Sequence, residues 1–148
     1  MIKTLHIGCD HAAVDLKDLL VNALKDRYEV VDHGTNSHES CDYPDFAHAV
    51  CRAVEKDPES NGILLCGTGI GMSIAANRHE KIRAALCTTE LHASFTRRHN
   101  DANVLCLGAR MTGEELAMAI VETFLHTDFE GGRHMRRIAK LAISNEAE

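Results

Sequence analysis

The feature that most constrains the fold is a short apolar run that ends in a glycine-rich loop. Residues 62–66 are typical of a buried strand, and Gly67, Gly69 and Gly71 follow at alternate positions. Residues 72–76 then favour a helix, so the stretch predicts a strand, a glycine loop and a helix in that order. Such a junction points free backbone N–H groups and the positive end of a helix dipole at the strand end, where an anion or a developing oxyanion fits.

Cys66 stands at the start of this loop, and the same field favours its thiolate form, which is a base or a nucleophile. The alternative is that Cys66 is a small hydrophobic residue at the end of a buried strand. The loop has neither the Lys-Ser/Thr ending of a P-loop nor the G-x-G-x-x-G spacing of dinucleotide-binding proteins. Met72 stands six residues after the cysteine, where a thiol phosphatase needs an arginine, which argues against that class.

Composition excludes several classes of protein. The 148 residues, 45% of them hydrophobic, predict one domain over residues 1–148. No apolar run reaches membrane length and no basic leader precedes one, so we expect a cytoplasmic protein without a membrane partner. The net charge of −6 argues against a nucleic-acid partner. The six cysteines form no C-x-x-C pair and the ten histidines no H-x-x-x-H pair, so we expect reduced thiols and no metal site.

Apolar runs alternate with helical patterns along the chain. The predicted strands are residues 2–8, 28–32, 62–66, 82–87 and 103–107. The predicted helices are residues 14–24, 45–55, 71–76 and 90–98, one that follows a capping box formed by Thr112 and Glu115, and a last one over about 131–143. This alternation predicts a three-layer αβα fold with a five-stranded parallel, Rossmann-like sheet.

Polar residues follow the predicted strands. Asp10 and His11 come after the first strand, where ligand-binding groups of parallel sheets lie, although Asp10 also suits a helix cap. Tyr43 precedes Pro44 and is therefore expected to be extended, either as a packing residue or as a wall of a pocket. Arg133 and Arg137, four residues apart, share a helix face that suits a phosphate; the alternative is an exposed basic helix end.

Six segments together resemble ribose-5-phosphate isomerases of the B type: residues 8–11, 42–44, 62–71, 98–104, 107–110 and 130–134. They occur in order over nearly the whole chain. The resemblance implies interconversion of D-ribose 5-phosphate and D-ribulose 5-phosphate through an enediolate, in the pentose phosphate pathway, without a metal or an organic cofactor. It also implies a homodimer, or a tetramer built from it, in which the segment with His99 and Asn100 completes the site of the neighbouring subunit.

The resemblance further implies a role for each matching residue. Cys66 is the base that moves the proton between C2 and C1, and His99 opens the furanose ring. Thr68 and Asn100 are hydrogen-bond partners of the enediolate oxygens, and Asp10 holds a sugar hydroxyl. The amides that bind the enediolate belong to Gly67, Gly69, Ile70 and Gly71. The residues that bind phosphate and sugar are His11, Arg110, Arg133 and Arg137, with Tyr43 lining the ring and the last helix docking at the site or the dimer interface.

Two other functions stay open. Some similar enzymes act on six-carbon substrates, allose 6-phosphate or galactose 6-phosphate, and some carry the base on a glutamate in the helix after the glycine loop. Here residues 74–76 are Ile-Ala-Ala, so Cys66 is the preferred base, and Cys66 together with His99 favours the ribose enzyme. The less favoured alternative is a non-catalytic sugar-phosphate sensor, which needs the arginines and the loop but neither Cys66 nor His99.

Overall fold

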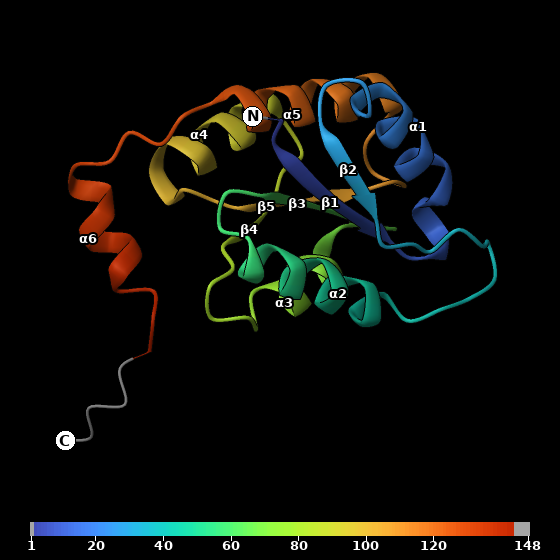
Figure 1. Ribbon diagram of the computed structural model, residues 1–148, viewed down its shortest axis with the longest axis horizontal. Helices are drawn as coiled ribbons and strands as arrows, with labels where there is room; N and C mark the ends of the chain where they lie inside the picture. Colours follow the sequence, from blue (N-terminus) through green and yellow to red (C-terminus); the bar gives the residue numbers. More distant parts are fainter. Residues whose placement is uncertain (1, 144–148) are drawn as a thin grey trace.

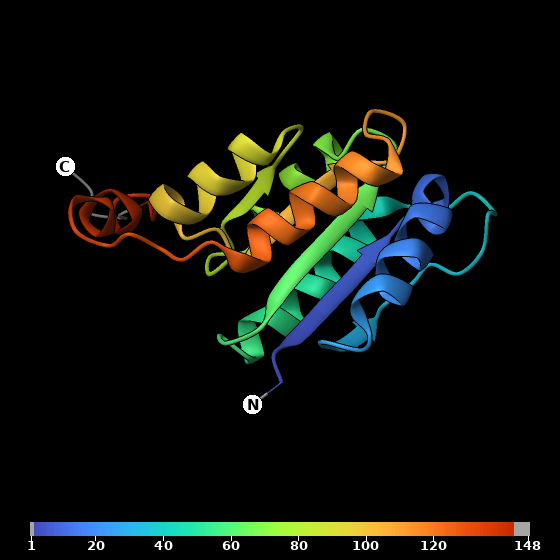
Figure 2. The same ribbon diagram turned by 90° about the horizontal axis from the view of Figure 1, so that it is seen from above.

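The computed structural model describes residues 2–143, which form a parallel sheet with helices on both faces (Figures 1 and 2). The strands are β1 (Thr4–Cys9), β2 (Glu29–Asp32), β3 (Asn61–Cys66), β4 (Ala84–Leu86) and β5 (Val104–Gly108). All of them pair in parallel, in the order β2-β1-β3-β5-β4. The predicted five-stranded parallel sheet is therefore confirmed.

The helices form the two outer layers of the fold. They are a 3₁₀ turn η1 (His11–Ala13), α1 (Val14–Leu24), α2 (Tyr43–Lys56), α3 (Ile70–Ala76), α4 (Glu90–Asn100), α5 (Glu114–His126) and α6 (Arg133–Ala139). Helices α2 and α3 cover one face of the sheet, and α1, α4 and α5 cover the other (Figure 1). Helix α6 lies beyond the sheet, next to α4 (Figures 1 and 2).

The central strand β3 shows why the sequence folds into three layers. All six of its residues are buried. Ile63 and Leu65 belong to the hydrophobic core beneath α1 and α5, whereas Leu64 and Cys66 belong to the core beneath α2 and α3. A strand that is buried on both faces needs apolar residues at successive positions, which explains the uninterrupted apolar run in the sequence.

Three local predictions were wrong. Helix α5 starts at Gly113 as its N-cap without a side-chain cap, so Thr112 does not form the predicted capping box. Tyr43 is the first residue of α2 and not extended, because Pro44 is tolerated in the first helical turn. The last helix is shorter than the predicted 131–143. It starts two residues later, because Gly131 and Gly132 have positive φ angles of 69° and 60°, outside the helical region, and it ends at Ala139.

Within residues 2–143, no helix is both long enough and apolar enough to cross a membrane.

Candidate active site

The topology predicts a ligand-binding site beyond the carboxyl ends of β1 and β3. The chain leaves β1 toward β2 and leaves β3 toward β4, in opposite directions along the sheet. The connecting helices α1 and α3 therefore lie on opposite faces, and open parallel sheets bind ligands at such a switch point. Cys66 ends β3 and Asp10 follows β1, so both residues lie at this edge.

Cys66 is buried, with 5% of its surface exposed. Its Sγ accepts the backbone N–H of Gly69 at 3.1 Å. A negatively charged sulfur accepts such a hydrogen bond more strongly than a neutral thiol does. A cysteine that only packs against apolar neighbours does not need a hydrogen-bond donor at its sulfur. The contact therefore favours Cys66 as a reactive thiol over Cys66 as a packing residue.

The glycine loop turns tightly from β3 into α3. Gly69 has a φ of 79°, a backbone conformation that favours glycine. The Gly69 amide donates to Cys66 and the Ile70 amide donates to Thr68 Oγ1 at 3.2 Å. The Gly69 and Ile70 donors that we expected to face a substrate thus stabilise the loop itself, whereas Gly71 and Met72 at the helix start have no intrahelical acceptor.

Arg110 reaches this loop because β5 pairs with β3. The Ala109 and Arg110 amides donate to the carbonyls of Cys66 and Gly67, both at 2.9 Å. A Cβ atom on Gly67 would lie 3.2 Å from Arg110 Nη1, so the guanidinium lies directly over the loop. An exposed guanidinium in this position can bind a phosphate or a developing oxyanion.

Asp10 and His11 connect this edge to the loop formed by residues 33–42. The Asp10 carboxylate accepts the Ala12 amide at 3.0 Å, so Asp10 is the helix cap that its sequence position allowed. His11 Nδ1 accepts the backbone N–H of Cys41 at 3.2 Å. Because an accepting Nδ1 carries no proton, the neutral His11 ring has its N–H at Nε2, where it is free to donate to a ligand.

Tyr43 completes this group of residues from the first turn of α2. Its ring lies against the start of α3, because a Cβ atom on Gly71 would lie 2.7 Å from Tyr43 Cζ. The side chain is 38% exposed, which leaves part of the ring open to solvent. The structure therefore brings together the predicted residues Asp10, His11, Tyr43, 66–71 and Arg110.

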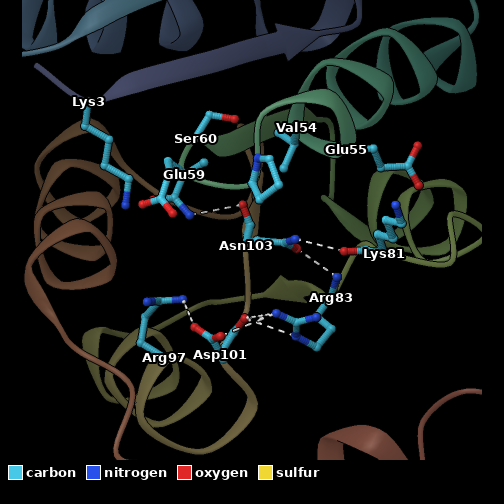
Figure 3. Close-up of a pocket in the computed structure, with 12 residues that line it drawn as sticks. Lys3, Val54, Glu55, Glu59, Ser60, Lys81, Arg83, Arg97, Asp101 and Asn103 are labelled. Atoms are coloured by element: carbon cyan, nitrogen blue, oxygen red, sulfur yellow. Dashed lines mark hydrogen bonds and ion pairs between the residues drawn. The ribbon is translucent and has the colours of Figure 1, made fainter.

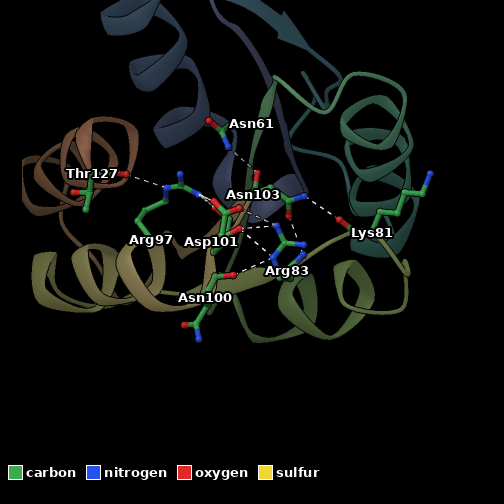
Figure 4. Close-up of polar contacts among 9 residues, drawn as sticks. Asn61, Lys81, Arg83, Arg97, Asn100, Asp101, Asn103 and Thr127 are labelled. Carbon is green, nitrogen blue, oxygen red and sulfur yellow. Dashed lines mark hydrogen bonds and ion pairs between the residues drawn. The ribbon is translucent and has the colours of Figure 1, made fainter. Parts of the chain in front are cut away.

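His99 and Asn100 lie at the opposite edge of the sheet. They are the last two residues of α4, whose 11 residues run back from the carboxyl edge over about 16 Å. The Asn100 carbonyl accepts Arg83 Nε at 3.0 Å, next to the start of β4 (Figure 4). Because proton transfer requires heavy atoms about 3 Å apart, His99 and Cys66 of one chain cannot act on the same sugar.

Arg133 and Arg137 are also separated from Cys66. Both side chains are exposed on α6, which lies beside α4 (Figure 2). They are therefore grouped with His99 and not with Arg110. The predicted phosphate-binding set is divided between two parts of the chain.

A polar cavity of about 430 Å³ also lies at the amino-terminal edge, where the starts of β1, β3, β4 and β5 converge (Figure 3). Its two arginines already bind protein acceptors. Arg97 donates to the Asp101 carboxylate at 3.0 Å and to the Thr127 carbonyl at 3.2 Å, and Arg83 donates to the Asp101 carbonyl (Figure 4). We interpret these contacts as a structural network that fixes the strand starts.

Sequence reasoning missed one residue that supports the site. Lys17 is fully buried, with Nζ 2.6 Å from Asp32 Oδ2 and 2.7 Å from Asn36 Oδ1. Burial, the largest single effect, would lower the pKa of this ammonium, but the hydrogen bonds to Asp32 and Asp18 and the charge of Asp32 together outweigh it and the pKa is raised. Lys17 thereby anchors the 33–42 loop. The sequence feature that could have predicted its burial is its spacing. Lys17 lies four residues after Ala13 and three before Leu20, on the buried stripe of α1.

Comparison with known proteins gives consistent matches. The model of the Ribose/Galactose Isomerase family matches residues 5–141. Ribose-5-phosphate isomerase B of Escherichia coli K12 is 46% identical over 138 residues, which is 93% of either chain. The structure of a ribose 5-phosphate isomerase from Thermotoga maritima superposes with a TM-score of 0.91 at 53% identity, over 94% of this chain and 97% of that one. The Mycoplasma genitalium ribose-5-phosphate isomerase B with bound ribulose-5-phosphate gives 0.92 at 42% identity, over 95% of each chain.

Proposed function

Because this chain belongs to the ribose/galactose isomerase family, we propose that it is an enzyme that interconverts D-ribose 5-phosphate and D-ribulose 5-phosphate. The observation that carries the proposal is the position of Cys66. Its sulfur lies at the switch point of the sheet, accepts the Gly69 amide, and belongs to the loop that Arg110 covers. This arrangement combines a base with donors for negative charge.

We assign the proton transfer to Cys66. In the open-chain aldose, the thiolate removes the proton from C2, and the electron pair forms the C1–C2 double bond while negative charge moves to O1. The O2 proton then passes to O1, and C1 takes the proton from the Cys66 thiol as the C2 carbonyl forms, which gives the ketose and restores the thiolate. We assign Thr68 and the amide of Gly71 to hold the charged oxygens, since Met72 is fully buried. A fixed donor of this kind contributes about 3 kcal/mol.

Ring opening requires a second copy of the chain. We place His99 and Asn100 of that copy at the Cys66 edge of the first, with His99 moving the proton between the anomeric hydroxyl and the ring oxygen. Large apolar side chains exposed on α3 and α4 support a contact between copies: Ile70 (52%), Ile74 (53%), Leu91 (60%) and Phe95 (41%). A two-fold dimer would build two identical sites from these parts.

The same dimer would bring the phosphate-binding residues of two copies to one site. His11 Nε2 and Arg110 come from one copy, and Arg133 and Arg137 come from the other. Two exposed guanidinium groups on one helix face suit a phosphate dianion. Asp10 would hold a sugar hydroxyl, and the open part of the Tyr43 ring would line the sugar.

A coupled assay with ribose 5-phosphate, run in the presence of a chelator, tests this function. We expect turnover by the wild-type protein and a loss of at least about 10³-fold in Cys66→Ala, because general acid–base catalysis contributes about 10²–10⁴. Cys87→Ala is the matched control, since Cys87 is buried in the hydrophobic core on the opposite face of the sheet from Cys66. An active Cys66→Ala protein would contradict the proposed base.

Allose 6-phosphate, assayed in parallel, tests the range of sugars. A preference for the six-carbon sugar would indicate that the chain is an isomerase of six-carbon sugar phosphates. Binding of both sugars without turnover of either would indicate a sensor.

A further inference from the structure

Three potential metal ligands meet where α4 and α6 adjoin, and we call them the His99–Glu130–His134 cluster. One donor atom from each side chain lies within 4.8 Å of the other two. The His99 and His134 rings stack with centroids 4.6 Å apart and an angle of 21° between their planes. Two imidazoles and one carboxylate form the donor set of many sites that bind Zn²⁺ and keep one position open.

His134 gives independent support for a ligand at this cluster. Its side chain is 7% exposed, and its Nε2 has no hydrogen-bond partner among residues 2–143. A buried polar nitrogen without a partner is unfavourable, because it has lost its hydrogen bonds to water. The nearest opposite charge is Glu130 Oε2 at 3.4 Å, so a group that bridges these two atoms would remove the penalty.

The distances suit a small cation. In a four-coordinate Zn²⁺ site with bonds of 2.0–2.1 Å, neighbouring ligand atoms lie about 3.3 Å apart. His134 Nε2 and Glu130 Oε2 already have this separation at 3.4 Å. Glu130 is exposed and His99 half-buried, so rotation of their side chains can bring the third donor into range.

The surroundings of Glu130 hold its carboxylate ready for a cation. Its Oε1 accepts Arg98 Nε at 2.6 Å, and its backbone N–H donates to the Arg98 carbonyl at 3.1 Å. A hydrogen bond to the second oxygen of a ligating carboxylate is typical of metal sites.

We propose that the His99–Glu130–His134 cluster binds one divalent transition-metal ion of the Zn²⁺ class. A metal bound there occupies the His99 imidazole. If His99 opens the sugar ring, a consequence that rests on the proposed function, the metal inhibits isomerisation of the cyclic substrate.

Titration of the full-length, tag-free protein with Co²⁺ tests the site without reference to activity. We expect one Co²⁺ per chain, with the visible absorption of four-coordinate Co²⁺ and without a sulfur charge-transfer band. Glu130→Gln should weaken binding at least about tenfold. His134→Gln should abolish it, and because Glu130 is exposed, Glu130→Gln remains decisive where His134→Gln fails to fold.

His126→Gln is the matched control. His126 and Glu122 have the same four-residue spacing and lie 3.2 Å apart on α5, but no third ligand joins them within the described chain. We expect this variant to bind Co²⁺ like the wild-type protein. Undiminished binding in Glu130→Gln, no binding by the wild-type protein, or a thiolate band would each overturn the proposal.

Inhibition by Zn²⁺ then tests metal binding and the proposed role of His99 as two separate claims. We expect Zn²⁺ to inhibit the wild-type enzyme and to inhibit Glu130→Gln at least about tenfold more weakly. Stoichiometric binding without inhibition would support the metal site and contradict the assignment of ring opening to His99.

Discussion

Cys66 differs from the other buried cysteines in its hydrogen bonding. Burial raises the pKa of Cys9, Cys51 and Cys87 to about 12, and it also raises the pKa of Cys106. These groups therefore remain neutral thiols at physiological pH and cannot act as bases. Cys66 instead has a backbone N–H directed at its sulfur and lies at the carboxyl edge of the sheet, where open parallel sheets commonly bind ligands.

Gly71 keeps the Tyr43 ring against the start of α3. In Gly71→Ala, the new Cβ would lie 2.7 Å from the ring, so Tyr43 must move, although alanine suits the helical backbone. We expect kcat/KM for ribose 5-phosphate to fall about tenfold, which corresponds to about 1.4 kcal/mol, while the protein stays folded. Steady-state kinetics and circular dichroism measure the two effects.

Gly113→Ala is the control for this substitution. A Cβ at Gly113 meets no atom within 4 Å. Its kinetics should match the wild-type protein, with a stability loss of about 1 kcal/mol because alanine is a poorer N-cap than glycine. Equal kinetics in both variants would show that the Tyr43 ring does not contribute to the site.

Among the elements, the 33–42 loop depends most on one buried charge. Lys17→Met removes the ammonium that binds Asp32 and Asn36. We expect the free energy of unfolding to fall by about 3 kcal/mol, as for other broken buried pairs, and KM to rise because the Cys41 amide no longer holds His11. Urea denaturation and steady-state kinetics test the two parts.

Lys25→Met provides the comparison, because Lys25 bonds only to Asn22 at 3.3 Å on the surface of the protein. It should change stability by less than about 0.5 kcal/mol. An unchanged KM in a folded Lys17→Met protein would show that the loop does not depend on Lys17.

A histidine pair that joins β1 to the end of β2 should make stability depend on pH. His6 Nδ1 lies 3.0 Å from His33 Nε2, and burial lowers the pKa of both rings below the ordinary value of 6.5. The unfolded chain therefore binds more protons than the folded chain in mildly acidic solution, so stability rises with pH in this range. We expect the urea midpoint to fall as the pH drops below about 6.5 and through the lowered pKa values.

Replacing both histidines by glutamine should flatten this dependence. His38→Gln is the control, since the His38 side chain is 70% exposed and its loss should leave the slope unchanged. If the double variant keeps the wild-type slope, the pair does not titrate as its burial implies.

The strands could be predicted from the sequence because each needs a local run of apolar residues. The apolar run at 62–66 identified β3 and Cys66 at its end, and the polar residues after the first strand identified Asp10. Arg110 was expected only from the resemblance to the isomerase family. The strand order could not be predicted, because helical connections allow several orders. The partners of Lys17 also depend on tertiary structure, since Asp32 and Asn36 come from beyond α1.

The His99–Glu130–His134 cluster was missed for the same reason. The sequence contains no H-x-x-x-H pair, and the expectation of no metal site rested on that pattern. Here Glu130 and His134 have the four-residue spacing of one helix turn, but His99 joins them only when α6 lies beside α4. The contact between these helices could not be inferred from local patterns.

For the whole molecule, the main consequence of the fold is that the predicted site residues form two groups at opposite edges of the sheet. The group with Cys66 lies where β1 and β3 end, and the group with His99 lies where α4 ends, about 16 Å back along that helix. The Cys66 group contains the proposed base but not the proposed ring-opening residue, and the His99 group contains the ring-opening residue but not the base. We therefore propose a catalytic unit of two chains that face each other.

Complementation between inactive variants tests this account most directly. Cys66→Ala and His99→Gln chains are unfolded, mixed in equal amounts and refolded, and their turnover of ribose 5-phosphate is compared with that of each variant refolded alone. With a shared site, half of the dimers are mixed and each mixed dimer has one intact site, so activity should return to about one quarter of the wild-type value. Activity no greater than the average of the two variants would show that Cys66 and His99 do not meet across two chains.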